Sequence, residues 1–250
     1  MKKTALLLVL CSVLSVCFSA CGPAPDKSEP AQTTLSFKEK ASYYDSLADA
    51  GEVASVEMTD PTALYRVSGS RNLVDGEVYT DIINVFNRIY PDIYYKYGKE
   101  YYEPIITLNF DPTYLRDDPA NVVGNTININ INWFNNNHDK ASVIVYYIAA
   151  TVLDYNSSAP EWLKSSINYY IAAEFSAYGY EFSGKYSGEH YEDGGKVGAN
   201  FLHWIKAKYL VDIAYRANKT LTSSTWYESD FWSKETGRSL ENLWAEYRSR

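Results

Sequence analysis

The chain has 250 residues, which is enough for one sizeable domain or two small ones. It carries 31 acidic residues against 23 basic ones, and its formal net charge is −8 at neutral pH. This balance argues against nucleic-acid binding and against electrostatic adhesion to anionic lipids. Tyrosine is unusually abundant, with 24 residues scattered along the chain, and it suits both a partly hydrated core and a recognition surface.

The first twenty residues have the three regions of a bacterial export signal. Lys2 and Lys3 form the positive region, Leu6 to Val16 is apolar, and Phe18-Ser19-Ala20 ends in small residues. Cys21 follows directly and completes what looks like a lipobox. Residues 1–20 are therefore predicted to be a lipoprotein signal peptide, with Cys21 as the lipidated residue. An ordinary secretory signal followed by a chance cysteine is the alternative.

The cysteine count agrees with lipidation. The three cysteines are Cys11, Cys17 and Cys21, so one remains after cleavage and no intramolecular disulfide can form. Acyl chains on Cys21 would anchor the protein firmly to a lipid bilayer. Residues 21–40 are rich in Pro, Ser, Thr, Ala and charge and are predicted to be a flexible tether. We expect a lipid-anchored protein of the bacterial cell envelope, at the periplasmic face or at the outer membrane or cell surface.

Residues 41–250 are predicted to form one domain, whose first half contains one helix and short strands. A strand is predicted over Ala63 to Val67. The helical spacing of apolar residues predicts a helix over Asp75 to Tyr97, which Pro91 would break or kink. Pro104 to Phe110 is rich in β-forming residues. Val122 to Ile131 contains the clearest strand, because isoleucine alternates with asparagine near its end.

Two helices joined by a tight turn are predicted at mid-chain. The first, Lys140 to Tyr155, is apolar almost all the way round and is therefore predicted to be buried. The second runs from Glu161 to Phe175. In the turn, Ser158 and Glu161 have capping-box spacing, and Pro160 suits a first helical turn.

The remaining elements are a loop and two helices. Tyr178 to Val197 is rich in glycine and is predicted to be a mobile loop. A helix is predicted over Ala199 to Ala217, and a short one over Leu240 to Tyr247 with Ser239 as its cap. The order of helix, strands and helices predicts an α+β fold. Its sheet would be small, mixed or antiparallel, and packed on the buried helix.

Five segments, in order and at similar spacing, resemble the plant basic secretory proteins and their bacterial relatives, a family of peptidases of plants and bacteria regarded as zinc metallopeptidases. The resemblance extends from about Asn72 to Arg248. Its segments are Ile105–Ile131, Val143–Asp154, Ala159-Pro160 with Leu163 and Tyr170, Gly194 through Phe201-Leu202, and Thr236-Gly237-Arg238-Ser239 with Leu243-Trp244-Ala245-Glu246-Tyr247. It implies a zincin-like domain in which the first mid-chain helix is the former active-site helix.

The catalytic residues of that family are missing from this chain. Its H-E-x-x-H motif places two imidazoles on zinc and uses the glutamate as a general base. The resemblance aligns the two histidines with Tyr147 and Thr151, and the glutamate with Ile148. The acidic positions of the second helix align with Ser165 and Tyr169. A later tyrosine of the family aligns with Gly195, and the nearest carboxylate, Asp154, lies one turn beyond the motif.

No other constellation in the sequence favours catalysis. The three histidines, His138, His190 and His203, have no metal-ligand spacing. Acidic residues surround His190, but such a cluster is more often a solvated loop. A carboxylate pair for sugar hydrolysis stays open, since an acidic chain always supplies pairs. We predict no catalytic residue, no metal site and no cofactor.

Three hypotheses follow for function. In the first, the protein is an inactive metallopeptidase-like lipoprotein whose cleft binds a peptide or glycan, with a cleft lined by Tyr147, Thr151, Asp154, Ser165 and Tyr169. The strand Thr126–Ile131 would offer its edge to an extended peptide. In the second, a hydrolase uses a site that the family lacks, around Asp154 or the loop Glu189–Asp193. In the third, the protein is a purely structural envelope subunit, and Tyr147 and Tyr169 are buried rings that fill the space left by the metal.

Overall fold

The computed structural model describes residues 65–99, 105–153, 155, 159–223 and 228–250. These residues belong to one compact unit. The predicted signal peptide, Cys21 and the tether lie outside the described residues, as does Asp154. None of the described helices is long and apolar enough to cross a membrane.

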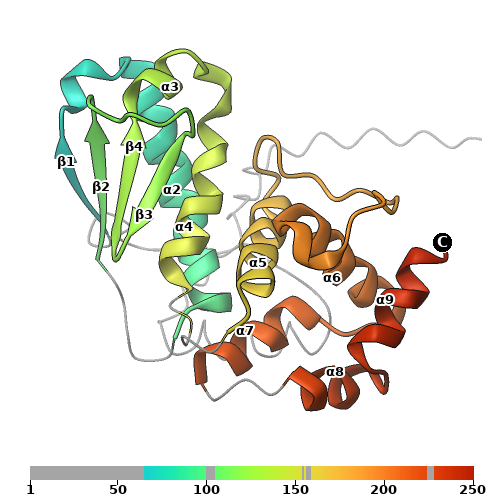
Figure 1. Ribbon diagram of the computed structural model, residues 1–250. Coiled ribbons are helices and arrows are strands. Elements are labelled where there is room, and N and C mark those ends of the chain that lie inside the picture. Colours follow the sequence, from blue (N-terminus) through green and yellow to red (C-terminus); the bar gives the residue numbers. More distant parts are fainter. Residues whose placement is uncertain (1–64, 100–104, 154, 156–158, 224–227) are drawn as a thin grey trace, which may run out of the picture. The chain divides into compact units, whose positions relative to one another are not determined.

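Short strands and helices come first in the described chain, and helices alone follow (Figure 1). In chain order the elements are β1 (Tyr65–Gly69), η2 (Arg71–Leu73), α2 (Gly76–Tyr97), β2 (Ile106–Asp111), β3 (Ala120–Val123), β4 (Thr126–Asn130), α3 (Ile131–Asn135), η3 (His138–Val143), α4 (Ile144–Val152), α5 (Glu161–Glu174), η4 (Tyr191–Asp193), α6 (Gly195–Tyr209), α7 (Ile213–Ser223), α8 (Glu228–Thr236) and α9 (Leu240–Arg248). The α+β class predicted from the sequence is confirmed.

The sheet is mixed, with the strand order β1-β2-β4-β3. Strands β1, β2 and β4 run parallel, and β3 pairs antiparallel with β4. The strand predicted within Val122–Ile131 is β4, and the start of that range belongs to β3, because Gly124 adopts a positive φ of 56° and turns the chain between the two strands. Ile131 already belongs to α3. The proposed free edge on Thr126–Ile131 is therefore wrong, since β4 is paired on both sides and β3 is the edge strand.

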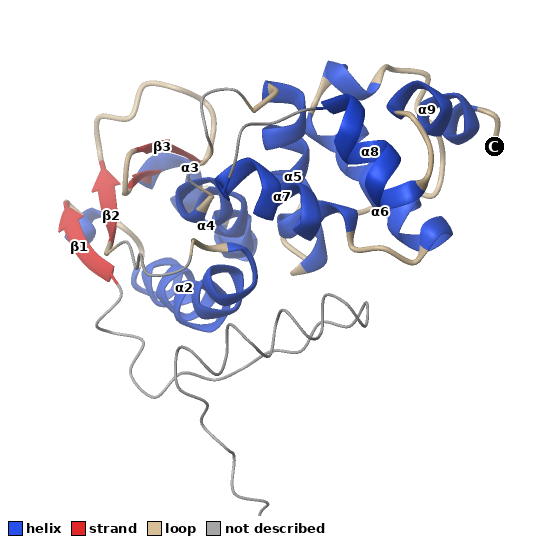
Figure 2. Ribbon diagram, turned by 90° about the horizontal axis from the view of Figure 1, so that it is seen from below, coloured by secondary structure: helices blue, strands red, loops and turns tan. Residues whose placement is uncertain are grey.

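The two faces of the sheet differ in chemistry. One face is apolar and buried: its side chains include Leu108, Phe110, Ile127 and Ile129. Helices α2 and α4 lie against this face (Figures 1 and 2). On the other face, a row of polar side chains crosses all four strands, with hydrogen bonds from Ser68 to Asn109, from Asn109 to Asn128 and from Asn128 to Asn121. This row satisfies the amides of the sheet's polar side and ties the strands in register.

Three helix predictions need correction. Helix α2 continues for six residues beyond Pro91, so of the predicted break or kink the break is wrong. The regular part of the buried mid-chain helix spans Ile144–Val152, since residues 138–143 form a 3₁₀ helix. The helix predicted over Ala199–Ala217 is two helices, because Leu210 adopts a left-handed conformation after Tyr209 and ends α6. Ser239 caps α9 as predicted, accepting a hydrogen bond from the Asn242 amide.

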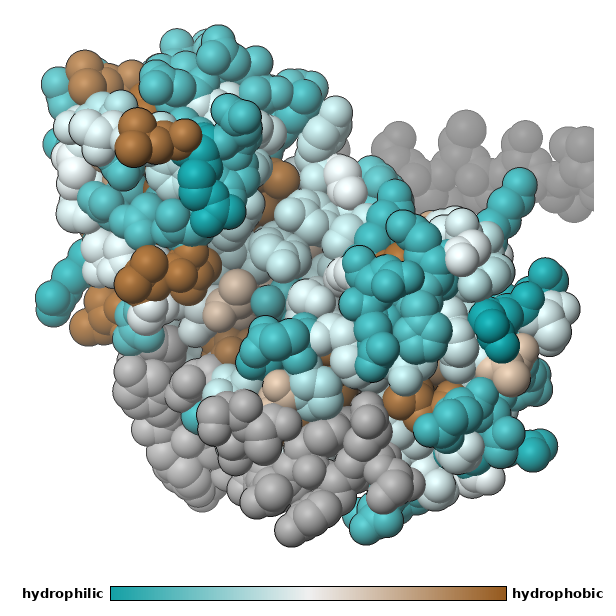
Figure 3. All heavy atoms as spheres, viewed as in Figure 1, coloured by the Kyte–Doolittle hydropathy of each residue, from teal (hydrophilic) through white to brown (hydrophobic). Residues whose placement is uncertain are grey.

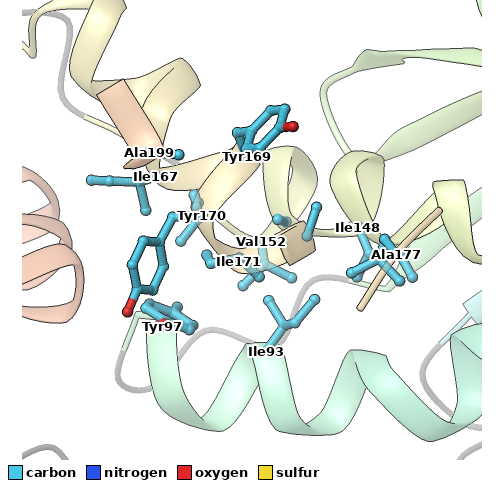
Figure 4. Close-up of a cluster of buried hydrophobic side chains, with 14 of the residues drawn as sticks. Ile93, Tyr97, Ile148, Val152, Ile167, Tyr169, Tyr170, Ile171, Ala177 and Ala199 are labelled. Carbon is cyan, nitrogen blue, oxygen red and sulfur yellow. The ribbon is translucent and has the colours of Figure 1, made fainter. Parts of the chain in front are cut away.

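The core of the helical half lies between α2, α4 and α5. Figure 4 shows Ile93 and Tyr97 of α2 facing Val152 of α4 and Tyr170 of α5, while Tyr169 projects from the opposite side of α5. Helix α6 packs closely on α5 because Gly198 has no side chain: a Cβ there would overlap the Ser166 hydroxyl. On the face seen in Figure 3, hydrophobic side chains gather mainly over the sheet. Ile105, Leu115 and Val123, in or next to the segments of β2 and β3, are exposed.

Four charged side chains form a buried cluster where α2, α5, α6 and the start of α7 meet. Lys96 Nζ lies 3.0 Å from Glu174 Oε1 and 3.3 Å from Asp212 Oδ2. Lys206 Nζ lies 3.1 Å from Asp212 Oδ2 and 3.7 Å from Glu174 Oε1. The Tyr97 hydroxyl donates to Glu174 at 2.7 Å. Two cations and two anions thus neutralise one another between four helices.

Candidate functional site

The predicted cleft residues fall into two groups. Thr151 at the end of α4 and Ser165 on α5 line a hollow of about 580 Å³. Tyr147 and Tyr169 do not line it; both belong to a cluster of tyrosines beside it. Asp154 lies outside the described residues. Two of the five predicted cleft residues therefore line the hollow, and the prediction of a ligand cleft at these residues stays a prediction.

The hollow is built from the β3–β4 hairpin, the last turns of α4 and the first turns of α5. A volume of about 580 Å³ is typical of a small-ligand site. Its lining mixes apolar, hydroxyl, amide and charged side chains. They are Lys99, Val122, Gly124, Asn125, Tyr146, Ala150, Thr151, Val152, Leu153, Tyr155, Glu161, Lys164, Ser165 and Asn168. Lys164 and Glu161 form an ion pair with each other.

The hydroxyl of Tyr147 forms a hydrogen bond within the fold. It accepts a hydrogen bond from the backbone of Ala120, on edge strand β3. Burial raises the pKa of Tyr147 above its ordinary value, the nearby Asp118 carboxylate raises it further, and the bond from Ala120 opposes both. One turn later, Thr151 Oγ1 donates to the Tyr147 carbonyl at 2.7 Å. The two positions that the resemblance aligns with histidines thus bear oxygens that form hydrogen bonds with the backbone.

The hydroxyl of Tyr169 fastens the segment that follows α5. It donates to the Gly179 carbonyl at 3.3 Å and accepts a hydrogen bond from the backbone of Glu181. Burial, and then the Glu181 carboxylate, raise the pKa of Tyr169. Between these two anchor points, the ring of Tyr180 stacks on Tyr146 at 5.2 Å and contacts Tyr169 at 4.9 Å.

Tyr146, Tyr147, Tyr169 and Tyr180 therefore form one group, called here the tyrosine plug. Burial raises the pKa of Tyr180 well above 10, and its tyrosine neighbours add to the shift. Burial raises the pKa of Tyr146 as well. All four phenols stay protonated at neutral pH, so the plug offers no phenolate as nucleophile or cation ligand. The interpretation of Tyr147 and Tyr169 as rings that fill space agrees with this packing.

Two buried polar atoms at the wall of the hollow have no hydrogen-bond partner. They are the Tyr155 hydroxyl and Asn168 Oδ1. The amide of Asn168 is bonded to the Tyr146 hydroxyl, which leaves its carbonyl oxygen unpaired. Burial raises the pKa of Tyr155, so its hydroxyl remains a hydrogen-bond donor. Both atoms have almost no accessible surface, so they lie behind the wall of the hollow and do not face its open space.

The acidic residues around His190 serve local structure. His190 is the N-cap of η4: its backbone amide donates to Asp193, and its ring nitrogen accepts from the Glu192 amide. Its ring packs on Tyr191 at 4.1 Å and on Trp244 at 5.4 Å. Within the part of the chain that the structure describes, no group of three or more His, Cys, Asp and Glu residues is arranged to hold a metal ion.

Sequence reasoning missed Tyr146, Tyr155, Tyr180 and Asn168 as parts of this region. The abundance of tyrosine was the available signal, but the spacing of tyrosines along the chain does not reveal which of them converge. Tyr180 reaches the plug from a glycine-rich segment, and Gly179 takes a positive φ of 78° there. The position of that segment depends on tertiary contacts alone.

The position aligned with a later family tyrosine is sterically closed. A Cβ at Gly195 would lie 2.8 Å from the Ser165 carbonyl oxygen. Real Cβ atoms do not approach so closely, so a tyrosine at position 195 would push α6 away from α5. This contact adds to the differences between the chain and the zinc-binding pattern.

Comparison with known proteins identifies one family. Residues 137–247 match the family model described as peptidase of plants and bacteria, which covers the segments from η3 through α9. Four of the five segments that carry the resemblance lie inside this range, and Ile105–Ile131 lies before it. No curated protein and no solved structure matches the chain. Residues 137–247 thus match a domain of the family of peptidases of plants and bacteria, which supports the predicted resemblance to the basic secretory proteins.

Proposed function

We propose that this protein is a catalytically inactive, zincin-like member of its family, held at the bacterial cell envelope by a lipid on Cys21, and that its hollow binds a ligand. The observation that carries the proposal is the hydrogen bonding of the two former histidine positions. Tyr147 is bonded to Ala120, and Thr151 to the Tyr147 carbonyl. Neither side chain is available to a metal ion.

Zinc does not fit these residues. A catalytic zinc site needs three protein ligands, commonly imidazoles, thiolates or carboxylates. Tyr147 and Thr151 supply a protonated phenol and a hydroxyl, and Ile148 replaces the general base with an aliphatic group. Ser165, in the second helix, donates its hydroxyl hydrogen to the Trp162 carbonyl. No hydrolytic step can be derived from these groups.

A binding role is supported by the hollow beside the tyrosine plug. The plug closes the former catalytic position, while a space of about 580 Å³ with polar walls stays open next to it. A second candidate is a structural envelope subunit with no ligand, which the closed plug alone would favour. The open hollow favours the binding role, because hydroxyl and amide side chains contribute to its wall.

Metal content and hydrolysis test the inactive assignment together. The full chain, purified in detergent and incubated with zinc, is expected to contain far less than one zinc ion per chain by mass spectrometry, and to cleave no casein. The variant Tyr147→His/Ile148→Glu/Thr151→His, with the motif rebuilt on α4, provides the comparison: it is expected to bind more zinc than the native chain. Stoichiometric zinc in the native chain, or hydrolysis abolished by a chelator, would refute the proposal.

A further inference from the structure

The free edge of strand β3 turns main-chain groups of one residue toward the hollow. The amide of Asn130 donates to the Pro119 carbonyl at 2.9 Å, in the antiparallel register of β3 and β4. Hydrogen-bonded and non-hydrogen-bonded positions alternate along such a pair. The N–H and C=O of Ala120 and of Val122 therefore point away from β4, and the bond from the Ala120 backbone to Tyr147 agrees with this direction. Val122 also lines the hollow.

This edge suits a peptide, but only over a short length. Peptides that add to a sheet bond with their main chain to the outward N–H and C=O groups of an edge strand. Strand β3 has four residues, and the Ala120 amide is already bonded to Tyr147. The outward groups of Val122 are the ones that lie at the hollow, whose volume is about 580 Å³. Such a site fits the end of a chain better than a long segment.

Charged side chains in the wall determine which end of a chain fits. Lys99, Lys164 and Glu161 line the hollow, so two positive charges meet one negative charge among the described residues of its wall. The whole chain, by contrast, has a net charge of −8. A peptide's carboxyl terminus is negative and accepts hydrogen bonds, which a lysine ammonium donates. Its amino terminus would add a further positive charge, so the wall favours the carboxyl end.

The ion pair between Lys164 and Glu161 does not exclude a ligand carboxylate. The Lys164 side chain is 21% exposed, whereas the Glu161 side chain is 90% exposed. An ion pair with so exposed a partner contributes little, because water and salt screen it. A ligand carboxylate inside the hollow meets the same ammonium in a less hydrated place, where the attraction is stronger. The ligand therefore takes the place of Glu161 at Lys164.

We propose that the hollow between the β3–β4 hairpin, α4 and α5 binds the free carboxyl terminus of a peptide. The terminal carboxylate bonds to Lys164 and Lys99, and the main chain of the peptide bonds to Val122 on β3. This inference rests on the proposed function, since it names the ligand class of the same hollow. The peptide is held and released without any covalent step.

The test compares two peptides that differ in one charge. Acetyl-trialanine with a free carboxylate and acetyl-trialanine carboxamide are each titrated into the full chain in detergent micelles and followed by saturation-transfer NMR. The carboxylate peptide is expected to bind saturably, and the carboxamide peptide about tenfold more weakly, as for the loss of one charge-assisted hydrogen bond. Equal affinities, or no saturable binding of the carboxylate peptide, would overturn the inference.

Lysine variants assign the carboxylate to the wall of the hollow. Lys164→Met keeps a long apolar stem, so it should weaken the carboxylate peptide about tenfold and leave the carboxamide peptide unchanged. Lys234→Met, the same change at an exposed residue of α8, is the matched control and should alter neither affinity. A preference for the carboxylate that survives in Lys99→Met/Lys164→Met would overturn the inference.

Proline substitutions test the edge strand. Val122→Pro removes an N–H that points away from β4, and edge strands tolerate proline at such positions. The variant should therefore still unfold cooperatively in urea while it weakens both peptides. In Val123→Pro the lost N–H belongs to the ladder with Thr126, so this control should lower the urea midpoint instead. Native affinity for the carboxylate peptide in Val122→Pro would overturn its placement on β3.

The outcomes also separate this inference from the proposed function. If both peptides bind equally and Val122→Pro weakens both, the carboxyl terminus is wrong as the ligand, while an inactive binding protein remains. If neither peptide binds and chelator-sensitive hydrolysis appears, the proposed function itself fails.

Discussion

Replacing Lys96 with methionine should strongly destabilise the protein. The ammonium of Lys96 lies 3.0 Å from Glu174 and 3.3 Å from Asp212, and the side chain is 1% exposed. Lys96→Met keeps a long apolar stem but leaves two carboxylates facing one remaining cation, Lys206. Removal of one partner from a buried ion pair costs about 3–5 kcal/mol. We expect about 3 kcal/mol, at the lower end of that range, because Lys206 still neutralises one carboxylate and Glu174 is 12% exposed.

Urea unfolding of the full chain, followed by tryptophan fluorescence, measures this loss as a lower midpoint at an unchanged slope. The matched control is Lys164→Met, which breaks the pair with Glu161 at the surface, where the Glu161 side chain is 90% exposed. That change should cost less than about 1 kcal/mol. Equal losses for the two variants, or a loss below 1 kcal/mol for Lys96→Met, would refute the view that burial makes this cluster indispensable.

The pH dependence of the same comparison follows from Asp212. Burial tends to raise the pKa of its carboxyl, but Lys96 and Lys206 outweigh burial and hold the pKa below 3.8. A carboxyl with a lowered native pKa stabilises the fold above its unfolded pKa, and this stabilisation is lost as pH falls through the native pKa. Because Lys96→Met removes one of the two lowering charges, the stability difference from the native chain should be largest near neutral pH and shrink below about pH 4. A stability difference between Lys96→Met and the native chain that grows as pH falls would contradict this expectation.

Two further substitutions test the packing of the site region by the same urea assay. Gly198→Ala places a methyl group on the Ser166 hydroxyl and should lower the free energy of unfolding by about 1–3 kcal/mol through overpacking. Gly184→Ala is the control and should change the free energy of unfolding little, because nothing lies near its Cβ. Equal effects of the two variants would show that α5 and α6 are free to separate. Tyr147→Phe removes the bond to Ala120 and should cost about 1 kcal/mol. No loss of stability in Tyr147→Phe would mean that the plug does not depend on this bond.

Residue identity and local periodicity determined several helices and the chemical groups that this protein carries. The spacing of apolar residues predicted α2, α5 and α9, and Ser239 marked the start of α9, because capping and amphipathicity depend on neighbours within a few residues. The absence of histidine from α4 is also a property of the sequence, while the alignment of Tyr147 and Thr151 with the histidines of the family stays a prediction. The export signal and Cys21 are predictions from the sequence alone.

Tertiary structure decided what those residues do. Lys96 and Glu174 are 78 residues apart, and no local pattern pairs them. The internal place of β4, which removed the predicted peptide edge, follows from pairing with β2 and β3. Likewise, Thr151 faces the hollow while Tyr147, one turn earlier, bonds to β3. Local patterns specify which groups are present, whereas contacts between distant segments determine which of them are buried and which line the hollow.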